Sequence, residues 1–223
     1  MLERGALILQ HGATGPPGVL GTWLAERGIP ARVVDLRDGA DTPDPAEFDF
    51  VASLGSEFSV NDGEPWIAVE RRTLHRALSR EVPVLGLCFG GQSLAVSLGG
   101  EVEPMPATEV GWLHVDSEDP DLIPSGPWLE YHRERFTVPP GAVQLARRET
   151  SAQAFAHGPH MGLQFHPEAT AEIVDAWVDL DPEFDAYGIE RAAVGAPGEQ
   201  TEAAAAANAR RLFDAWLRRW AGA

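Results

Sequence analysis

Short apolar runs alternate with helical patterns in the first part of the chain. Ala6 to Gln10 and Phe50 to Leu54 are apolar without a helical period, which is typical of strands buried on both faces. Val19 to Arg27 has the pattern of a helix, and Ala31 to Leu36 has that of a further strand. A strand, a helix and a strand within about thirty residues predict a βαβ unit with a parallel sheet and a right-handed crossover.

The alternation continues toward the middle of the chain. Pro65 to Arg80 has apolar residues partly at helical spacing and a proline at its start, so it predicts a helix. Val82 to Leu87 is apolar with no helical period and predicts another buried strand. A helix is expected from Gly91 to about Gly99.

From Glu101 the pattern changes to short strand candidates separated by turns. These candidates are Val102 to Pro104, Val110 to Val115, Trp128 to Tyr131, Val143 to Arg147, Ala152 to Ala156 and Met161 to Phe165. Such a run predicts antiparallel strands added to a parallel core.

The last part of the chain is expected to be mainly helical. Ala169 to Val178 predicts a helix, Asp179 to Gln200 an irregular surface segment, and Glu202 to Trp220 a long helix with one apolar stripe. Core packing is the favoured role of that stripe, and a partner interface is the alternative. Together the patterns predict one α/β domain over residues 1–223, with a flavodoxin-like, doubly wound, mostly parallel sheet and an antiparallel extension.

Composition narrows the class of protein. With 223 residues and 44% hydrophobic content, the chain can bury an ordinary globular core. Its formal net charge of -17 repels nucleic acid and anionic membranes, so neither is an expected partner. No apolar stretch has the length of a membrane span, no signal-peptide pattern precedes the first strand, and one cysteine permits no internal disulfide. We expect a cytoplasmic protein.

That cysteine, Cys88, stands between the predicted strand and helix in the middle of the chain. Gly86 lies two residues before it and Gly90 two residues after it. A nucleophile on a sharp strand-to-helix turn needs such small neighbours, because larger side chains would collide with the adjoining strand and helix. The helix dipole there favours thiolate over thiol. A buried structural cysteine is the alternative, and the glycines favour an accessible nucleophile instead.

A possible partner for this thiol follows the strand candidate Met161 to Phe165. His166 can take a proton from the thiol and later return one to a leaving amine. Glu168 lies two residues further on, so on an extended backbone it faces the same side and can orient the imidazole. A structural histidine is the alternative, which the cysteine elbow in the same chain makes less favoured.

These motifs together resemble the class I (triad) glutamine amidotransferases. Gly86 to Gln92 is similar to that family's G-x-C-x-G-x-Q elbow, and Gln164 to Glu168 matches its Q-F-H-P-E. Three further segments stand at corresponding places in the family's order: Leu54 to Ser56 at the oxyanion loop, Glu109 to Trp112 at an E-[IV]-G-W strand, and Tyr131 to Arg133 at a W-H-G turn. The resemblance is strongest to stand-alone members often labelled GMP-synthase-like.

The resemblance implies an oxyanion hole made of backbone groups. The N–H of Gly55 or Ser56, together with that of Phe89, would hold the oxyanion formed during acyl transfer. The family often has two glycines in this loop, so Ser56 departs from its pattern. Because the contact is through the backbone, we expect it to survive that change. Without the resemblance, Gly55 would be an ordinary turn glycine.

The resemblance also implies substrate-binding residues, namely Gln92, His132, Arg133 and Glu134. Gln92 lies one turn past Cys88 on the same helix face, and the matching family residue contacts glutamine. Tyr131 to Glu134 is expected to be a loop whose backbone amides are available to the substrate carboxylate. An ordinary hydrogen-bonded turn histidine is an equal alternative for His132.

The implied activity is that of a glutaminase. The Cys88 thiolate would cleave the side-chain amide of L-glutamine through a γ-glutamyl thioester, with His166 moving the protons. No metal or organic cofactor is expected, because one cysteine and scattered histidines do not build a metal site. The chain has no glycine-rich phosphate loop, so the ammonia would pass to an acceptor on another polypeptide, such as a synthetase subunit.

Three other functions remain open at this point. A free-standing γ-glutamyl peptidase or hydrolase would use the same groups on γ-glutamyl peptides or conjugates, and a large side pocket would support it. A non-catalytic binding protein of the same fold is disfavoured by the intact Cys88, His166 and Glu168. A cysteine-protease-like enzyme with the same elbow is disfavoured by the match at Gln164 to Glu168.

Overall fold

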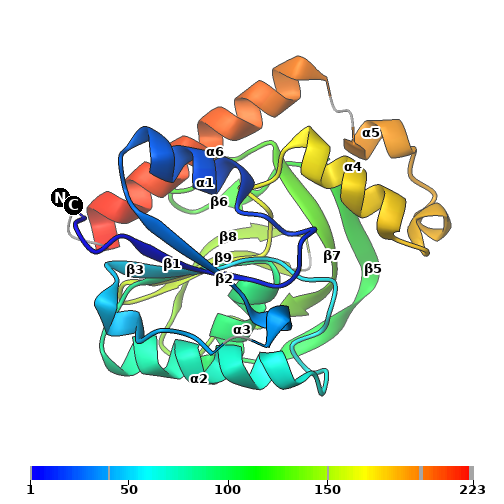
Figure 1. The fold of residues 1–223 in the computed structure, drawn as a ribbon. Helices are drawn as coiled ribbons and strands as arrows, with labels where there is room; N and C mark the ends of the chain where they lie inside the picture. The colour runs from blue at the N-terminus through cyan, green and yellow to red at the C-terminus, as the bar shows by residue number, and fades with distance from the viewer. Residues whose placement is uncertain (1, 40, 150, 196–197, 221–223) are drawn as a thin grey trace.

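The computed structural model describes residues 2–39, 41–149, 151–195 and 198–220 (Figure 1). Its centre is an eight-stranded sheet in the order β2-β1-β3-β4-β10-β9-β8-β6. In that order the strands are Ala31–Asp35, Ala6–Gln10, Phe50–Ser53, Val84–Leu87, His160–Leu163, Ser151–His157, Val143–Arg148 and Asp116–Ser117. The first five pair in parallel, and the last three continue the sheet with antiparallel pairing. The predicted mostly parallel sheet with an antiparallel extension is confirmed.

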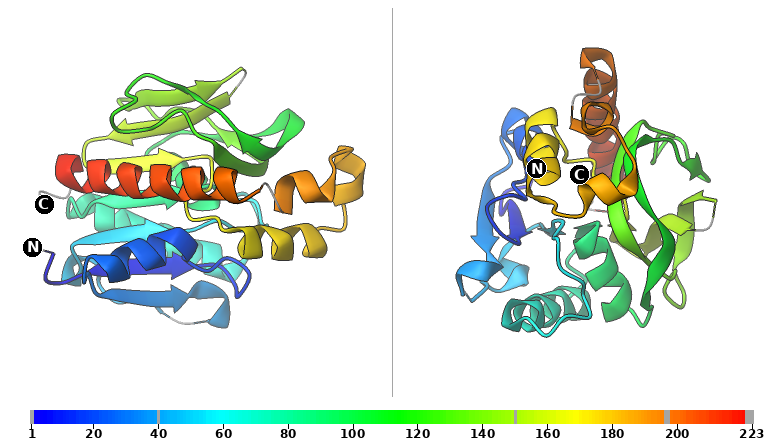
Figure 2. Two further views of the ribbon diagram at one scale, coloured as in Figure 1. Left: turned by 90° about the horizontal axis from the view of Figure 1, so that it is seen from above. Right: turned by 90° about the vertical axis from the view of Figure 1, so that its right-hand side faces the viewer.

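The inner parallel strands β1, β3 and β4 are mainly apolar because helices cover both faces of the sheet there. The edge strand β2 carries Arg32 and Asp35 and is exposed over its first three residues. Ala6 and Ile8 of β1 face a core shared with α1 (Gly18–Glu26) and α6 (Glu199–Trp220). Leu7 and Leu9 face a second core shared with α2 (Pro65–Ser79) and α3 (Phe89–Ser97). Figure 1 shows α1 and α6 on one side of the sheet and α2 on the other, and Figure 2 shows α6 lying lengthwise beside α1.

The long helix α6 packs mainly into the core. Its buried residues recur at helical spacing: Ala205, Ala209, Leu212, Phe213, Trp216 and Leu217. The Trp216 ring meets Phe50 of β3 edge-on, with ring centroids 5.2 Å apart. Core packing, the favoured role of the apolar stripe, is therefore what the structure shows. No helix among the described residues is both long and apolar enough to cross a membrane.

A separate two-stranded sheet stands beside the antiparallel end of the main sheet. It consists of β5 (Val102–Leu113) and β7 (Trp128–Phe136), which pair antiparallel. The two strand candidates at 102–104 and 110–115 are thus one strand with an irregularity between Pro104 and Glu109. An antiparallel bridge between Leu129 and His166 joins β7 to the segment after β10.

The sequence prediction was wrong for two segments. Residues 131–134 were expected to form a loop, but they lie in β7, where His132 is paired with Glu109 of β5. Residues 179–200 were expected to be irregular, but they contain the end of α4 (Ala171–Leu180), a 3-10 turn (η3, Phe184–Tyr187), α5 (Arg191–Gly195) and the start of α6. Two further 3-10 turns, η1 (Leu36–Asp38) and η2 (Pro45–Glu47), flank the loop before β3.

Candidate active site

Two of the predicted catalytic residues, Cys88 and His166, and the predicted oxyanion residue Gly55 lie at the carboxyl ends of the parallel strands. Cys88 follows β4, His166 comes shortly after β10, and Gly55 comes shortly after β3. All three line one cavity of about 1150 Å³, and Ser56, Gln92, His132, Arg133 and Glu134 line it too. Ligands of open α/β sheets bind at this edge because the loops that leave parallel strands converge there.

Cys88 occupies a strained turn that only small neighbours permit. Its φ of 49° and ψ of -107° lie outside the regions that ordinary residues adopt, which costs on the order of 1–3 kcal/mol. A Cβ atom at Gly86 would lie 2.4 Å from the Gly90 carbonyl oxygen, and one at Gly90 would lie 2.2 Å from the Ser53 carbonyl oxygen. The predicted reason for the glycines is confirmed. The thiol is 5% exposed, so it is reached only through the cavity rather than from open surface.

His166 and Glu168 form a buried pair beside the thiol. The Nδ1 atom of His166 lies 2.7 Å from Oε1 of Glu168. The His166 backbone N–H donates to the Leu129 carbonyl. The imidazole ring of His166 packs edge-on against the Trp177 ring, with ring centroids 4.7 Å apart. A Cβ at Gly55 would lie 2.7 Å from Cε1 of His166, so the imidazole is packed directly against the loop after β3.

The electrostatics of this pair favour a charged imidazole. Burial opposes the charge on His166, but the Cys88 sulfur and the Glu168 carboxylate outweigh it and raise the pKa of His166 well above its usual range. An imidazolium beside a sulfur is the protonation state that a thiolate nucleophile requires. The arrangement can therefore supply a nucleophile, a proton carrier and a group that orients it.

The loop after β3 offers unpaired backbone donors near the thiol. Gly55 and Ser56 line the cavity, and Phe89 is the first residue of α3. Among the described residues, no hydrogen bond uses the N–H of Gly55, Ser56 or Phe89. Two amide groups without partners at the cavity, and a third in the residue that follows Cys88, are suited to a ligand oxygen that carries negative charge.

Gln92 faces the cavity one helical turn beyond Cys88. Its Nε2 donates to the Glu134 carbonyl oxygen at 3.1 Å and to Oε1 of Gln164 at 3.4 Å. Gln164 in turn points its Nε2 at the Cys88 sulfur, 3.7 Å away. The Gln92 amide therefore links the elbow helix to β7 rather than standing free in solvent.

His132 is held by protein groups on both ring nitrogens. Nε2 lies 3.0 Å from Oε2 of Glu130 and 3.1 Å from Oε2 of Glu109, and Nδ1 lies 3.0 Å from the Glu134 carbonyl oxygen. Burial lowers its pKa, but the two carboxylates raise it further, to about 10. With both nitrogens occupied as donors, His132 shapes the cavity wall and has no N–H left for a ligand. This corresponds to the alternative of a hydrogen-bonded histidine, in a strand instead of a turn.

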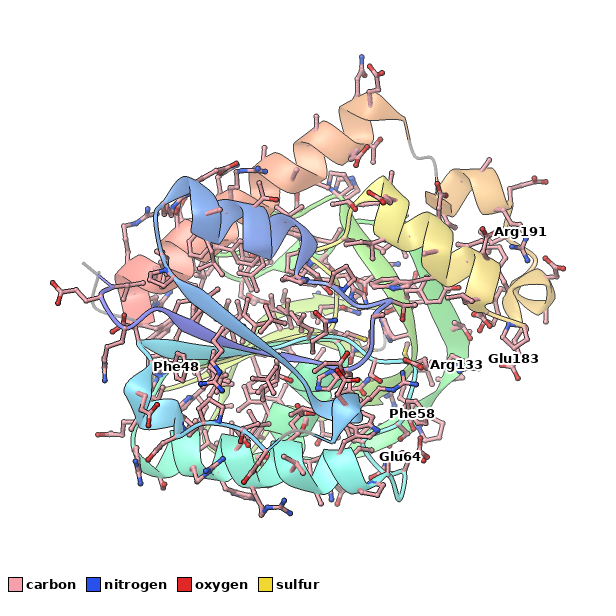
Figure 3. The ribbon with its side chains drawn as sticks, viewed as in Figure 1. Phe48, Phe58, Glu64, Arg133, Glu183 and Arg191 are labelled. Carbon is pink, nitrogen blue, oxygen red and sulfur yellow. The ribbon has the colours of Figure 1, made fainter. Side chains whose placement is uncertain are left out.

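Arg133 and Glu134 contribute in different ways from His132. The Arg133 guanidinium pairs with Glu183 at the molecular edge, where both side chains are more than half exposed. Figure 3 shows these two side chains approaching each other below α4. The Glu134 carbonyl oxygen accepts from both Gln92 and His132, so its backbone is tied to the wall as well.

One group of side chains within the described ranges has the ligand types of a metal site. Ligand atoms of Glu109, Glu130 and His132 all lie within 4.8 Å of one another. Nε of Arg148, however, lies 3.3 Å from Oε1 of Glu109. Two carboxylates facing an imidazolium and a guanidinium balance their charges without a cation, so we interpret the group as a buried ion-pair network.

Sequence reasoning missed several residues at this site. His11 lies 3.1 Å, through Nδ1, from the Gly55 carbonyl oxygen, and its Nε2 lies 2.8 Å from Oε2 of Glu70. Trp177 holds His166 by ring contact and donates its Nε1–H to the Thr14 carbonyl at 2.7 Å. The position of His11 directly after the first strand could have indicated it, since that end of a parallel strand faces the ligand site. Glu70 falls on the apolar face of its helix, which is unusual for a charged residue.

Comparisons of sequence place the chain among amidotransferases. A family model described as "Glutamine amidotransferase class-I" matches residues 59–176. One subunit of the glutamine-hydrolyzing GMP synthase from Ignicoccus hospitalis is 36% identical over 135 residues, which cover 56% of this chain and 70% of that protein. The glutamine-hydrolyzing GMP synthase of Aeropyrum pernix is 30% identical over 142 residues, but these cover only 28% of that longer protein.

Two solved structures are similar to nearly all of the chain. The crystal structure of a glutamine amidotransferase from Methylobacillus flagellatus has a TM-score of 0.89 at 27% identity, over 97% of this chain and 95% of that one. A glutamine amidotransferase from Thermotoga maritima has a TM-score of 0.87 at 24% identity and is similar in fold.

Proposed function

Because the chain belongs to the class-I glutamine amidotransferase family, we propose that it hydrolyses the side-chain amide of L-glutamine and that Cys88 is the nucleophile. The observation that carries this proposal is that Cys88 and His166 line one cavity and that Glu168 contacts the far nitrogen of His166. The strained turn at Cys88 adds support, since backbone strain persists where the surrounding structure imposes it.

The first half of the reaction forms a thioester. The Cys88 thiolate attacks the side-chain carbonyl carbon of glutamine, and the carbonyl oxygen becomes an oxyanion held by the free N–H groups of Ser56 and Phe89. The imidazolium of His166 donates its proton to the leaving nitrogen. The carbon–nitrogen bond breaks, ammonia leaves, and a γ-glutamyl thioester remains on Cys88.

The second half restores the thiolate. Neutral His166 takes a proton from water, the resulting hydroxide attacks the thioester carbonyl, and the same backbone donors hold the second oxyanion. Collapse of this intermediate releases glutamate and the Cys88 thiolate beside the His166 imidazolium. Glu168 keeps the imidazole oriented through both halves and stabilises its charged form.

We further propose that the ammonia is used by another polypeptide. The Ignicoccus and Methanocaldococcus jannaschii relatives are each one subunit of a glutamine-hydrolyzing GMP synthase, which implies a second one. By analogy, a synthetase subunit would dock over the cavity and receive the ammonia. Glutaminase units of this kind gain from being slow alone, because a docked partner then prevents waste of glutamine.

The purified chain tests the central proposal. We expect it to release ammonia and glutamate from L-glutamine, and we expect mass spectrometry of the quenched enzyme to find a γ-glutamyl adduct on Cys88. The Cys88→Ala chain is the control for both readouts. Ammonia release at the parental rate by this variant would refute the nucleophile.

A second function is favoured by the size of the cavity. Its volume of about 1150 Å³ exceeds the range of about 300–1,000 Å³ that suits drug-sized ligands, and glutamine is smaller than these. The extra space lies among residues from three separate segments: Asp38, Glu57, Asp62, Leu180, Pro182 and Tyr187. A γ-glutamyl peptide or conjugate would place its leaving amine in this space, and the same triad would cleave it.

Steady-state kinetics separate the two functions. A glutaminase is expected to have the higher kcat/KM on glutamine and to be stimulated when its synthetase partner docks. A γ-glutamyl hydrolase is expected to be fully active alone and to prefer γ-glutamyl dipeptides over glutamine. Rates on glutamine and on γ-glutamyl dipeptides, measured on the same preparation, decide between them.

A further inference from the structure

A buried histidine–glutamate pair lies behind the loop after β3 and takes no part in the reaction steps above. The His11 and Glu70 side chains are both 0% exposed, and Nε2 of His11 lies 2.8 Å from Oε2 of Glu70. The other carboxylate oxygen of Glu70 accepts from Oγ of Ser53 at 2.6 Å. Burying an ion pair costs desolvation free energy, so a buried pair at this position indicates a role beyond stabilising the fold.

The second nitrogen of His11 reaches the loop itself. Nδ1 lies 3.1 Å from the Gly55 carbonyl oxygen. Nδ1 is therefore in hydrogen-bond geometry with the Gly55 carbonyl, while Nε2 lies at ion-pair distance from the Glu70 carboxylate. A doubly protonated ring suits both contacts, because it donates from Nδ1 and carries the charge opposite to that of the carboxylate. The charged groups near the ring agree with this state: burial opposes the charge, but Glu70 and the more distant Asp35 raise the pKa of His11. The nearby Arg37 guanidinium donates to the backbone carbonyl of His11 and pairs with the Glu57 carboxylate.

This contact determines which way the Gly55–Ser56 peptide group faces. In a trans peptide the C=O and the following N–H point in opposite directions. With the Gly55 carbonyl turned toward His11, the Ser56 N–H is turned away from it. That N–H is one of the unpaired amides of the cavity. A cationic donor on the carbonyl also polarises the peptide group, which makes its N–H a stronger donor.

The His11 ring also touches the other segment that supplies an oxyanion donor. Its centroid lies 4.9 Å from that of Phe89 and 5.0 Å from that of Trp66. The Trp66 and Phe89 rings are themselves 5.3 Å apart. A single imidazole thus contacts both backbone segments, one by a hydrogen bond and one by ring packing.

We propose that His11, kept as an imidazolium by Glu70, is a positioning residue for the oxyanion hole. It orients the Gly55–Ser56 peptide so that the Ser56 N–H meets the oxyanion of the tetrahedral intermediate. This inference rests on the proposed function, in which that intermediate forms at Cys88. His11 itself touches no reacting atom.

Two variants are expected to remove the orienting contact of His11 in different ways. Glu70→Gln keeps the side-chain shape but removes the charge that holds the imidazolium, and His11→Phe keeps the ring packing but removes both N–H groups. The matched control is His160→Phe, because His160 is also buried, but it lies at the start of β10, the end of that strand away from the site. We expect kcat on glutamine to fall roughly 10- to 100-fold in both variants with KM within about twofold, and the control to keep its kcat.

Alkylation of Cys88 by iodoacetamide separates positioning from general damage. Substitution at the iodomethyl carbon develops no oxyanion, so the alkylation rate should stay at the parental value in both variants. A parallel loss of kcat, alkylation rate and melting temperature would mean a merely structural role and overturn the proposal. An unchanged kcat in Glu70→Gln would overturn it as well.

A measurement independent of activity completes the test. Nitrogen-15 NMR of the parental chain, recorded at a pH just above the usual pKa of histidine, should show both His11 ring nitrogens protonated. In Glu70→Gln one nitrogen should lose its proton and the Ser56 amide resonance should move. A neutral His11 in the parental chain would overturn the inference. A parental chain inactive on glutamine and on γ-glutamyl dipeptides would instead refute the proposed function, and the NMR result would still decide the state of His11.

Discussion

Two sets of residues line the cavity, and they are held in different ways. The first set, which we call the sheet-edge wall, consists of His11, Gly55, Cys88 and His166 at the carboxyl ends of the parallel strands. The second, the outer wall, consists of Tyr131, Arg133, Asp181 and Tyr187 from β7 and the segment after α4. Side chains of the first are buried and locked by glycine contacts, whereas the second relies on partly exposed polar pairs.

The difference between the two walls suggests that one carries out the chemistry and the other selects the substrate. Acyl transfer needs its groups within a fraction of an ångström, which buried contacts can maintain. Exposed pairs are worth about 0–1 kcal/mol each, so the outer wall can change shape or sequence at little cost. We infer that the sheet-edge wall determines the type of reaction. The outer wall determines which leaving group, ammonia or a larger amine, the enzyme accepts on the γ-carbonyl carbon.

The largest expected effect is on the nucleophile of the sheet-edge wall. Cys88→Ala should lower ammonia release by at least about 10⁴-fold, since no other thiol exists in the chain. The far-ultraviolet circular dichroism should not change, because alanine fits the space. Ammonia release near the parental rate would contradict the inference that the sheet-edge wall carries the catalytic residues.

The orienting carboxylate should have the next largest effect. Glu168→Gln leaves the His166 imidazole in place but removes the charge 2.7 Å from its Nδ1. We expect kcat to fall roughly 10²- to 10⁴-fold with little change in KM, less than for Cys88→Ala. A kcat equal to the parental value would show that Glu168 is only a packing residue.

A glycine substitution tests how tightly the sheet-edge wall is packed. In Gly90→Ala the new Cβ would lie 2.2 Å from a backbone oxygen of β3, which cannot move aside without disturbing the sheet. We expect the free energy of unfolding to fall by about 3 kcal/mol. Gly63→Ala is the matched control, because nothing lies within 4 Å of a Cβ there. Urea denaturation of the two variants gives the comparison, and equal stabilities would contradict it.

Much of the sheet-edge wall could be predicted from the sequence. β1, β3 and β4 are mainly apolar runs, with polar residues only at the ends of β1 and β3. The Gly-x-Cys-x-Gly spacing has a local steric cause that the structure shows. β7 was harder, because polar residues continue the strand past Tyr131 and Glu130 brings a fully buried carboxyl group into it. The contact from His11 to Glu70 was also missed, since it depends on how α2 packs against β1 and leaves no local pattern.

The buried pairs predict a pH response that the exposed pairs lack. The pKa of His132 is about 10, against about 6.5 unfolded, so its contribution to stability is complete below pH 6.5 and is lost as the pH rises through 10. The raised pKa values of His11 and His166 act with the same sign. The sequence contains no lysine that would titrate in this window.

We therefore expect the melting temperature to fall steadily from pH 7 to pH 10. His132→Gln should start lower and show a flatter curve, because the group that titrates is gone. A parental melting temperature constant over this range would contradict the charged state of these histidines. Differential scanning calorimetry at low buffer concentration measures both curves.

The smallest expected effect is in the outer wall. Arg133→Ala removes an exposed ion pair with Glu183 and should change the free energy of unfolding by less than about 1 kcal/mol. Its kcat on glutamine should stay within about threefold of the parental value, while the ratio of kcat/KM for γ-glutamyl dipeptides to that for glutamine should shift more. A loss of activity as large as that of Glu168→Gln would erase the distinction between the two walls.

The backbone of Cys88 bears on how such a chain would change if its activity were no longer selected. Glycine adopts a φ of 49° without the steric cost that cysteine has there. Replacing Cys88 by glycine should therefore stabilise the fold while ending catalysis. Drift under selection for stability alone would favour that exchange, so we infer that the cysteine is kept at this position for its sulfur.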